Sequence, residues 1–253
     1  MIYTITVAFA ISIFLLRFNF FRKPQKGILV LLYHRISDEK TGYSVDKFSI
    51  SPQVFKKHLS ILKKHGYRSV SPFEIDNIVD KKLYLKEKLV LITFDDGYRD
   101  NLDAAKILKD FGMTGLFFIS TAYIGKQYNG VNMLKIDDIK KLIKMGMYIG
   151  SHSHLHKKLS NLSKNEIERQ IQTSIDILKQ FQDIEDFAYP YGDINYNVIN
   201  VLRDLNIKRA YVIRQKKYLP NQYNSLNIPR SIIRSKDNTM DFYLIMTRGR
   251  AHF

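Results

Sequence analysis

The segment most informative about the architecture of this chain is Leu-Val-Leu-Ile-Thr-Phe-Asp-Asp-Gly at residues 89–97. Its first six residues are almost all apolar and include β-branched and aromatic side chains, a pattern typical of a strand buried on both faces of a parallel sheet. Two carboxylates, Asp95 and Asp96, follow directly. Because α/β folds place their chemistry at the carboxyl ends of the strands, the segment predicts a buried strand that leads into a functional site.

Strand-type and helix-type segments alternate along most of the chain. The other predicted strands are apolar runs at residues 27–33, 116–120, 147–150, 187–189 and 210–213. The predicted helices lie at residues 52–65, 101–110, 136–145, 164–181 and 198–205. This order predicts a parallel sheet, either open and doubly wound or closed into a barrel. Polar residues just after successive strands, including His34, Asp95, His152 and Tyr191, favour the mouth of a barrel.

The composition limits the kinds of protein that this chain can be. At 253 residues with 45% hydrophobic content, it fits one sizeable α/β domain. It has no cysteine, which excludes a disulfide framework, a thiolate metal site and a cysteine nucleophile. The formal net charge of +16 favours polyanionic partners, which include anionic lipid headgroups, acidic glycans and nucleic acids. We expect no nucleic-acid partner, because the chain has no arginine-rich tract or aromatic-basic RNA motif.

The first residues differ from the rest of the chain. Residues 2–16 are uncharged and mostly apolar, and Phe-Asn-Phe-Phe at residues 18–21 extends this run beyond Arg17. The run is about long enough to span a bilayer, and it lacks a basic n-region and a small-residue cleavage site. We therefore expect an uncleaved transmembrane helix at residues 1–22, a catalytic domain at residues 27–253, and contact with an anionic membrane surface. Basic residues that follow the run would leave this domain in the cytoplasm by the positive-inside rule.

Two clusters of polar residues are candidates for a metal site. The adjacent carboxylates Asp95 and Asp96 suit a divalent cation, and one of them could act as a base. Taken alone, an Asp-Asp-Gly sequence is as often a simple turn. Three of the seven histidines lie within residues 152–156, a density that core packing does not explain. Neutral imidazoles are common zinc ligands, although a polar surface loop remains the alternative.

Three motifs together indicate a family. They are Thr-Phe-Asp-Asp-Gly at residues 93–97, His-Ser-x-x-His-x-x-Leu at residues 152–159, and Tyr-Pro-Tyr-Gly at residues 189–192. In order and spacing they resemble the motifs of the polysaccharide deacetylase family, also called the NodB-homology or carbohydrate esterase 4 family. The resemblance extends from about Gly27 to Arg234. It implies a distorted (β/α) barrel of the NodB-homology type.

The resemblance also implies one divalent metal ion, most often Zn²⁺, with Co²⁺, Ni²⁺ and Mn²⁺ as alternatives. The ligands would be Asp96, His152 and His156. Asp95 would then be the general base that takes a proton from the attacking water. The chain would accordingly be a hydrolase that acts on an amide bond.

The remaining roles are also implied by the resemblance. The backbone N–H of Tyr191 would help to hold the oxyanion, and Pro190 of the same motif would orient or bind the substrate. Many relatives supply the general acid from a late Leu-x-x-His-like motif, which this chain lacks. Leu-Tyr-His-Arg at residues 32–35 is similar to the Tyr-His pair of a branch active on surface adhesin polysaccharides. We therefore assign the general acid to His34, with a structural histidine as the alternative.

One further departure concerns the catalytic aspartate. Many relatives have an arginine two residues before the motif proline, and this chain has Ala188 there. Arg230, in Ile-Pro-Arg at residues 228–230, is expected to replace that arginine from a neighbouring strand and to orient Asp95.

The sequence thus predicts a metal-dependent hydrolase that removes N-acetyl groups from an acetamido sugar, of the N-acetylglucosamine or N-acetylgalactosamine type, in a cell-envelope glycan. A lipid-linked sugar on polyprenyl phosphate is favoured by the expected anchor, and a polysaccharide is the other substrate class. A catalytically inactive glycan-binding module on the same fold is the alternative function. The side of the membrane stays open, because related domains often act outside the cytoplasm.

Overall fold

The structure is a computed structural model that describes residues 23–251 together with residues 7, 9 and 12. Within these residues, seven parallel strands form a closed ring. In spatial order they are β1 (Leu29–Tyr33), β12 (Ile228–Ile232), β11 (Arg209–Ile213), β10 (Asp186–Ala188), β9 (Tyr148–Ser151), β6 (Leu116–Ile119) and β5 (Leu89–Phe94). The expected barrel of the NodB-homology type is therefore the observed architecture.

The first strand closes the ring. β1 pairs with β12 on one edge and with β5 on the other, so that Leu32 has Ile232 and Thr93 as its two neighbours. The two-residue strand β4 (Arg68–Ser69) pairs with the first residues of β5. Two short pairs complete the described strands: β2 (Arg35–Ile36) with β3 (Ser49–Ile50), and β7 (Gln127–Tyr128) with β8 (Val131–Asn132).

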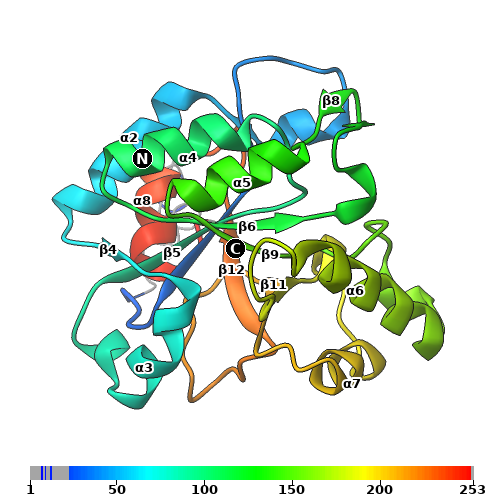
Figure 1. Ribbon diagram of the computed structural model, residues 1–253. Coiled ribbons are helices and arrows are strands. Elements are labelled where there is room, and N and C mark those ends of the chain that lie inside the picture. The colour runs from blue at the N-terminus through cyan, green and yellow to red at the C-terminus, as the bar shows by residue number, and fades with distance from the viewer. Residues whose placement is uncertain (1–6, 8, 10–11, 13–22, 252–253) are drawn as a thin grey trace.

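Helices surround the ring. They are α2 (Pro52–Lys64), α3 (Ile75–Asp80), α4 (Asn101–Asp110), α5 (Ile136–Lys144), α6 (Lys164–Leu178), α7 (Tyr196–Asp204) and α8 (Thr239–Arg248). Figure 1 shows α2, α4 and α5 on one side of the strands and α6 and α7 on the other. The starts follow from local sequence: the Ser51 side chain accepts a hydrogen bond from the Val54 N–H at 3.1 Å, and Ser163 forms a capping box with Glu166.

The strands are apolar throughout because both of their faces are buried. Leu29 and Leu31 of β1 belong to the core between the ring and the helices, whereas Val30 packs with residues of other strands inside the ring. The interior is filled tightly. A Cβ atom on Gly150 would lie 2.6 Å from the Phe118 ring, so only glycine fits at that position of β9.

The predicted elements agree closely with the observed ones. The strand expected at residues 89–94 and the helix expected at residues 101–110 have the bounds of β5 and α4. The helix predicted to reach residue 181 ends at Leu178, and α8 was not predicted. The expected transmembrane helix at residues 1–22 lies outside the described residues, apart from residues 7, 9 and 12. Among the residues that the structure describes, none of the helices has the length and apolar character needed to cross a membrane.

Candidate metal centre

Asp96, His152 and His156 converge at the carboxyl ends of the barrel strands. Asp96 follows β5, and the two histidines follow β9. The Asp96 Oδ1 atom lies 3.4 Å from His152 Nε2 and 3.2 Å from His156 Nε2. One ligand atom from each of the three residues lies within 4.8 Å of the other two. The structure thus brings together the three side chains that the sequence suggests as metal ligands.

The chemistry of these donors fits a metal ion. Tetrahedral zinc with bonds of about 2.0 Å to nitrogen and oxygen separates its ligand atoms by about 3.3 Å, close to the observed spacings. Among the described residues, Asp96 Oδ1 is buried without a hydrogen-bond partner. His152 Nδ1 lies 2.8 Å from the Ala188 carbonyl oxygen, which only accepts, so Nδ1 carries the hydrogen. In the neutral ring Nε2 is then left with the lone pair that a metal ion binds.

The electrostatics of the ligands agree with this assignment. Burial alone would raise the pKa of Asp96, but the adjacent His152 and His156 hold that pKa well below its ordinary value. Burial would lower the pKa of His152, yet the carboxylates of Asp95 and Asp96 raise it above the ordinary value. Both shifts indicate that the negative charge at Asp96 requires a positive group at this position. Protons on the imidazoles or a bound cation would meet that requirement.

The backbone of the site is held in unusual conformations. Asp96, Ser153, His156 and Tyr191 have φ values of 76°, 62°, 51° and 61°, in the left-handed region that non-glycine residues seldom occupy. Gly97 has a φ of 86°, and a Cβ atom there would lie 3.2 Å from Ile119 Cγ2. Such conformations cost about 1 kcal/mol or more each and are concentrated at functional sites. The Asp-Asp-Gly sequence is therefore a strained turn that presents two carboxylates.

Asp95 lies beside the three candidate ligands and is paired with an arginine. Arg230 Nη1 donates to Asp95 Oδ1 at 2.6 Å, and Nη2 donates to Oδ2 at 2.7 Å. Arg230 is completely buried, and its Nη1 also donates to Thr93 Oγ1 at 3.2 Å. Burial would raise the pKa of Asp95, but Arg230 and His152 lower it below its ordinary value. Arg230 therefore reaches from β12 to the end of β5, the position expected for a substitute of the missing arginine at Ala188.

His34 follows β1 and lines the same cavity. Its ring stacks on Phe48, with centroids 4.8 Å apart, and its Nδ1 atom is buried without a hydrogen-bond partner among the described residues. Asn101 Nδ2 donates to the His34 carbonyl oxygen at 2.8 Å and fixes the backbone there. Burial lowers the pKa of His34, although Asp96 and Asp95 oppose this effect. The His34 ring therefore lines the cavity within electrostatic reach of both aspartates.

Tyr191 and Pro190 form a short turn on the rim of the cavity. The turn is held by hydrogen bonds from the Gly192 N–H to the Tyr189 carbonyl at 2.9 Å and from the Asp193 N–H to the Pro190 carbonyl at 3.1 Å. Within the described residues the backbone N–H of Tyr191 donates no hydrogen bond. The Tyr191 ring is 54% exposed, with its centroid 4.6 Å from that of His156. The free N–H and the ring both belong to the wall of the site.

Aromatic residues that the sequence did not single out complete this wall. The cavity has a volume of about 430 Å³, and Phe48, Tyr98 and Tyr128 line it with Tyr191. Such rings suit the apolar faces of sugars. Tyr98 directly follows the Asp-Asp-Gly motif, so its place at the site could have been inferred, whereas nothing in the local sequence indicates Phe48 or Tyr128. His154 does not join the ligands, because its Nδ1 lies 2.9 Å from Thr121 Oγ1.

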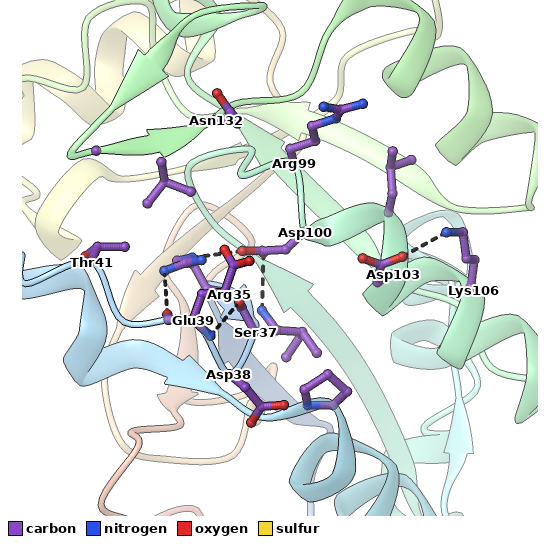
Figure 2. Close-up of a pocket in the computed structure, with 15 residues that line it drawn as sticks. Arg35, Ser37, Asp38, Glu39, Thr41, Arg99, Asp100, Asp103, Lys106 and Asn132 are labelled. Atoms are coloured by element: carbon purple, nitrogen blue, oxygen red, sulfur yellow. Dashed lines mark hydrogen bonds and ion pairs between the residues drawn. The ribbon is translucent and has the colours of Figure 1, made fainter.

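A second cavity, of about 530 Å³, is drawn in Figure 2. Figure 2 shows Arg35 and Asp100 facing each other at its centre, where Arg35 Nε donates to Asp100 Oδ2 at 2.8 Å. The first cavity is lined by Val45 and Tyr98 and the second by Val131, and these three residues pack in one small hydrophobic cluster. Both cavities therefore border the same apolar cluster.

Comparisons with known proteins agree with the motifs and the geometry. The model of the polysaccharide deacetylase family matches residues 82–210, just over half of the chain. The Bacillus subtilis protein YxkH, assigned by name to the polysaccharide deacetylases, is 31% identical over 176 residues, which are 68% of this chain and 59% of that relative. The poly-beta-1,6-N-acetyl-D-glucosamine N-deacetylase of Staphylococcus aureus (strain N315) is 25% identical over 235 residues, 83% of this chain and 79% of the relative.

Two solved structures share the fold. The Streptococcus pyogenes deacetylase PplD, in complex with acetate, superposes with a TM-score of 0.77 at 23% identity, covering 89% of this chain and 100% of that one. IcaB from Ammonifex degensii superposes with a TM-score of 0.77 at 24% identity, covering 89% of this chain and 97% of that one. At these identities the two likenesses establish the barrel and no more. Because the family model spans more than half of its length, this chain belongs to the polysaccharide deacetylase family.

Proposed function

We propose that this chain is a metal-dependent hydrolase that removes N-acetyl groups from an acetamido sugar of a cell-envelope glycan. The observation that carries the proposal is the arrangement of Asp95 beside Asp96, His152 and His156, with Asp95 held by Arg230. Three donors suited to a cation, of which Asp96 and His152 are buried, lie next to a carboxylate that is not needed as a ligand. A binding module without activity would require neither the paired carboxylates nor the strained turn.

The candidate ligands are Asp96 Oδ1, His152 Nε2 and His156 Nε2. A bound divalent ion would act as a Lewis acid that polarises the acetyl carbonyl and makes water nucleophilic near neutral pH. We propose Zn²⁺, because two imidazole nitrogens and one carboxylate oxygen are a common catalytic zinc set, with Co²⁺, Ni²⁺ and Mn²⁺ as substitutes. The Ala188 carbonyl fixes the orientation of the His152 ring for this role.

Asp95 is proposed to be the general base. Each of its oxygens accepts one hydrogen bond from Arg230 and retains a lone pair that can accept the proton of an attacking water. Arg230 keeps Asp95 ionised and fixes its direction, at some cost to its basicity, because the same contact lowers the pKa of the carboxyl. The pairing thus favours correct placement of the base over its proton affinity.

His34 and Tyr191, which both line the cavity, are proposed to complete the reaction. The His34 imidazole, which lines the cavity, would hand a proton to the departing sugar amine, which leaves poorly unless it is protonated. The backbone N–H of Tyr191 can donate to the oxyanion of the tetrahedral intermediate, an interaction often worth about 3 kcal/mol. Pro190 orients that N–H because it fixes the first residue of the turn.

The position of the amino-terminal segment bears on the substrate. The ligands lie at the carboxyl ends of the strands, whereas Pro24–Gly27 precedes β1 and lies at the other end of the barrel. If residues 1–22 anchor the catalytic domain 27–253 in a membrane, as we propose, the mouth faces away from the bilayer. This geometry favours a polymeric glycan over a sugar linked to polyprenyl phosphate. The Staphylococcus aureus relative, a poly-beta-1,6-N-acetyl-D-glucosamine N-deacetylase, supports a polymer of N-acetylglucosamine.

The second cavity also favours a polymer. Its lining includes Arg35, Asp100 and other polar residues, and it borders the same apolar cluster as the reaction site. A polysaccharide whose sugar units extend past the bound acetamido group has room for the next units there. The same orientation favours an extracytoplasmic domain, where envelope polymers lie, over the cytoplasmic location that the basic residues after the anchor suggest.

The proposal is tested by acetate release from defined substrates. Purified full-length protein loaded with Zn²⁺ is expected to release acetate from β-1,6-linked N-acetylglucosamine oligomers, and to release it more slowly from a polyprenyl-phosphate-linked N-acetylglucosamine. Binding of the oligomers without acetate release from any acetylated glycan would instead support the inactive glycan-binding module. Faster release from the lipid-linked sugar would contradict the polymer assignment alone.

A further inference from the structure

A cationic cavity lies at the end of the barrel opposite the candidate metal centre. It has a volume of about 360 Å³ and is lined by residues that precede β1 and β5, together with residues of α8. The lysine residues among its lining are Lys26, Lys86, Lys88 and Lys217. None of the cavity-lining residues has a role in the deacetylation proposed above.

The positive charges of this cavity are not neutralised by acidic side chains. Glu87 is the acidic residue of its lining, and the Glu87 carboxylate is directed to Arg68, whose Nη2 lies 3.3 Å from Oε2. Within the part of the chain that the structure describes, the four lysines of the lining form no ion pair. Lysines that face a common space without counter-charges repel one another, and a bound anion would remove that repulsion.

Lys217 is the buried member of the cluster. It is 6% exposed, its Nζ donates to Tyr67 Oη at 3.0 Å, and Tyr67 Oη in turn donates to the Met246 carbonyl oxygen at 2.8 Å. Burial, with repulsion from Lys88 added, lowers the pKa of Lys217 to about 8, so most of the charge remains at neutral pH. A buried ammonium group without a counter-ion is unfavourable, and two of its three N–H donors have no described acceptor.

We propose that this cavity binds the phosphate of an anionic lipid headgroup. A phosphate diester offers oxygen acceptors to the Lys217 ammonium and a negative charge to the surrounding lysines, which suits the unpaired donors. The lipid source is indicated by the chain itself. Pro24, Gln25 and Lys26 line the cavity and come shortly after the proposed anchor at residues 1–22. The Gln25 N–H donates to the Thr247 carbonyl at 2.9 Å, which fixes this segment to α8.

The position of the cavity close to the proposed anchor also agrees with lipid binding. A membrane-embedded segment that ends near residue 22 would place residues 24–26 at the level of the headgroups, where lysines gain attraction from anionic lipids. The assignment rests on the proposed anchor and not on the proposed hydrolysis. Lipid binding there would orient the barrel with this end toward the bilayer and the candidate metal centre away from it.

The first test measures thermal unfolding of the full-length protein in neutral detergent micelles. Sodium phosphate is compared with sodium chloride at equal ionic strength. At phosphate concentrations about ten times the dissociation constant, the midpoint temperature is expected to rise by roughly 3 °C or more. Lys217→Gln should abolish this rise. The control Lys140→Gln, which removes an equal charge from an exposed position on α5, should retain it. Equal rises in Lys217→Gln and wild type would overturn the site.

Lys88→Gln serves if Lys217→Gln does not fold, because Lys88 is exposed at the rim, where its Nζ donates to the His65 carbonyl at 3.0 Å. The increase in midpoint temperature that phosphate causes is expected to be smaller in this variant than in the wild type. An equal increase in both proteins would contradict anion binding in the cavity.

The second test separates lipid from free phosphate. An amine whose pKa is about 8 reacts faster with acylating reagents at neutral pH than ordinary lysines do, so labelling of Lys217 can be followed by mass spectrometry. The full-length protein is compared in vesicles of phosphatidylcholine alone and of phosphatidylcholine with phosphatidylglycerol. Labelling is expected to fall several-fold with phosphatidylglycerol, while labelling of Lys140 changes little. Protection by inorganic phosphate without protection by phosphatidylglycerol would overturn the lipid assignment, and protection by neither would overturn the site.

Discussion

Both carboxylate oxygens of Asp95 are bound by a single guanidinium group, that of Arg230, at 2.6 and 2.7 Å. The two residues are 135 positions apart in the sequence and meet because β12 and β5 flank β1 in the ring. The contact is buried on both sides, since the side chains are 0% and 3% exposed. A bidentate contact of this kind fixes the plane of the carboxylate, which a single lysine could not do.

Replacement of Arg230 tests the role of this contact. Arg230→Lys keeps the positive charge but loses the two parallel hydrogen bonds to Asp95. We expect kcat to fall roughly 100-fold while the metal content stays the same. Arg230→Ala leaves a buried carboxylate unpaired and is expected to destabilise the fold by about 3 kcal/mol or more. Steady-state kinetics, metal analysis and urea unfolding measure these effects. Unchanged kcat in a folded Arg230→Lys protein would remove Arg230 from the proposed machinery.

Asp95 and His152 are expected to differ in what their loss removes. Asp95→Asn should abolish acetate release while the protein still binds one equivalent of Zn²⁺, because Asp96 and both imidazoles remain. His152→Ala should abolish both activity and tight metal binding, since one of three ligands is lost. Elemental analysis after gel filtration gives the metal content. Loss of metal from Asp95→Asn would make Asp95 a ligand and not a base.

The role of His34 can be separated from simple packing by the leaving group. His34→Gln is expected to slow hydrolysis of the N-acetyl sugar by about 100-fold or more, because the amine must be protonated as it leaves. Hydrolysis of an activated phenyl acetate should be affected far less, because its leaving group needs no proton. If both substrates slow equally, His34 supports the structure of the site through its stacking on Phe48 and does not act as the acid.

His58 is expected to make the fold sensitive to acid. Its ring is stacked on Phe242 with centroids 3.8 Å apart, and burial, with Lys57 adding repulsion, lowers the pKa of His58 to about 4. In the unfolded chain the pKa is the ordinary 6.5, so protonation favours unfolding. The stabilisation that depends on a neutral His58 ring is fully present above pH 6.5. As the pH falls toward 4 this stabilisation is lost, and the free energy of unfolding decreases by about 3 kcal/mol in total.

The measurement is urea unfolding of wild type and His58→Gln between pH 7 and pH 5. The difference in unfolding free energy between the two proteins should narrow as the pH falls, because only the wild type carries the titrating ring. Lys140→Gln, far from His58, should keep the wild-type pH dependence. A constant difference across the range would show that His58 does not titrate in this window.

Local sequence patterns were sufficient for six of the seven ring strands, most helices and the carboxylate and histidine clusters, but not for β12 or the two-residue strands. Residues 89–97 contain a buried run, two acids and a glycine in consecutive positions, so both the strand and the turn could be predicted from nearest neighbours. The roles assigned to Asp95, Asp96, His152 and His156 remain proposals, although the structure brings these side chains together. α8 was missed even though Asn238 and Asp241 have the spacing of a capping box, a signal that local reading could have used.

Contacts between distant strands could not be predicted in the same way. The pairing of Arg230 with Asp95 was expected only from the family resemblance, because it depends on the order of strands in the ring. Phe48 ends a short 3-10 helix and Tyr128 ends β7, and no short pattern predicts that these two elements reach the cavity. The cationic cavity was missed for the same reason. Its lysines are scattered over residues 26–217 and gather only because β1, β5 and α8 meet at one end of the barrel.

The double pairing of β1 also has a consequence for biosynthesis. β1 is synthesised before the other ring strands. One of its edges pairs with β12, which begins at Ile228, so this edge has no partner until β12 has been made. Until those residues leave the ribosome, the nascent chain carries an open strand edge that can pair with other chains, and the carboxylate at the end of β5 lacks its guanidinium partner. A chain truncated before Ile228 should therefore be both prone to aggregation and inactive, so that activity appears only after β12 has been made.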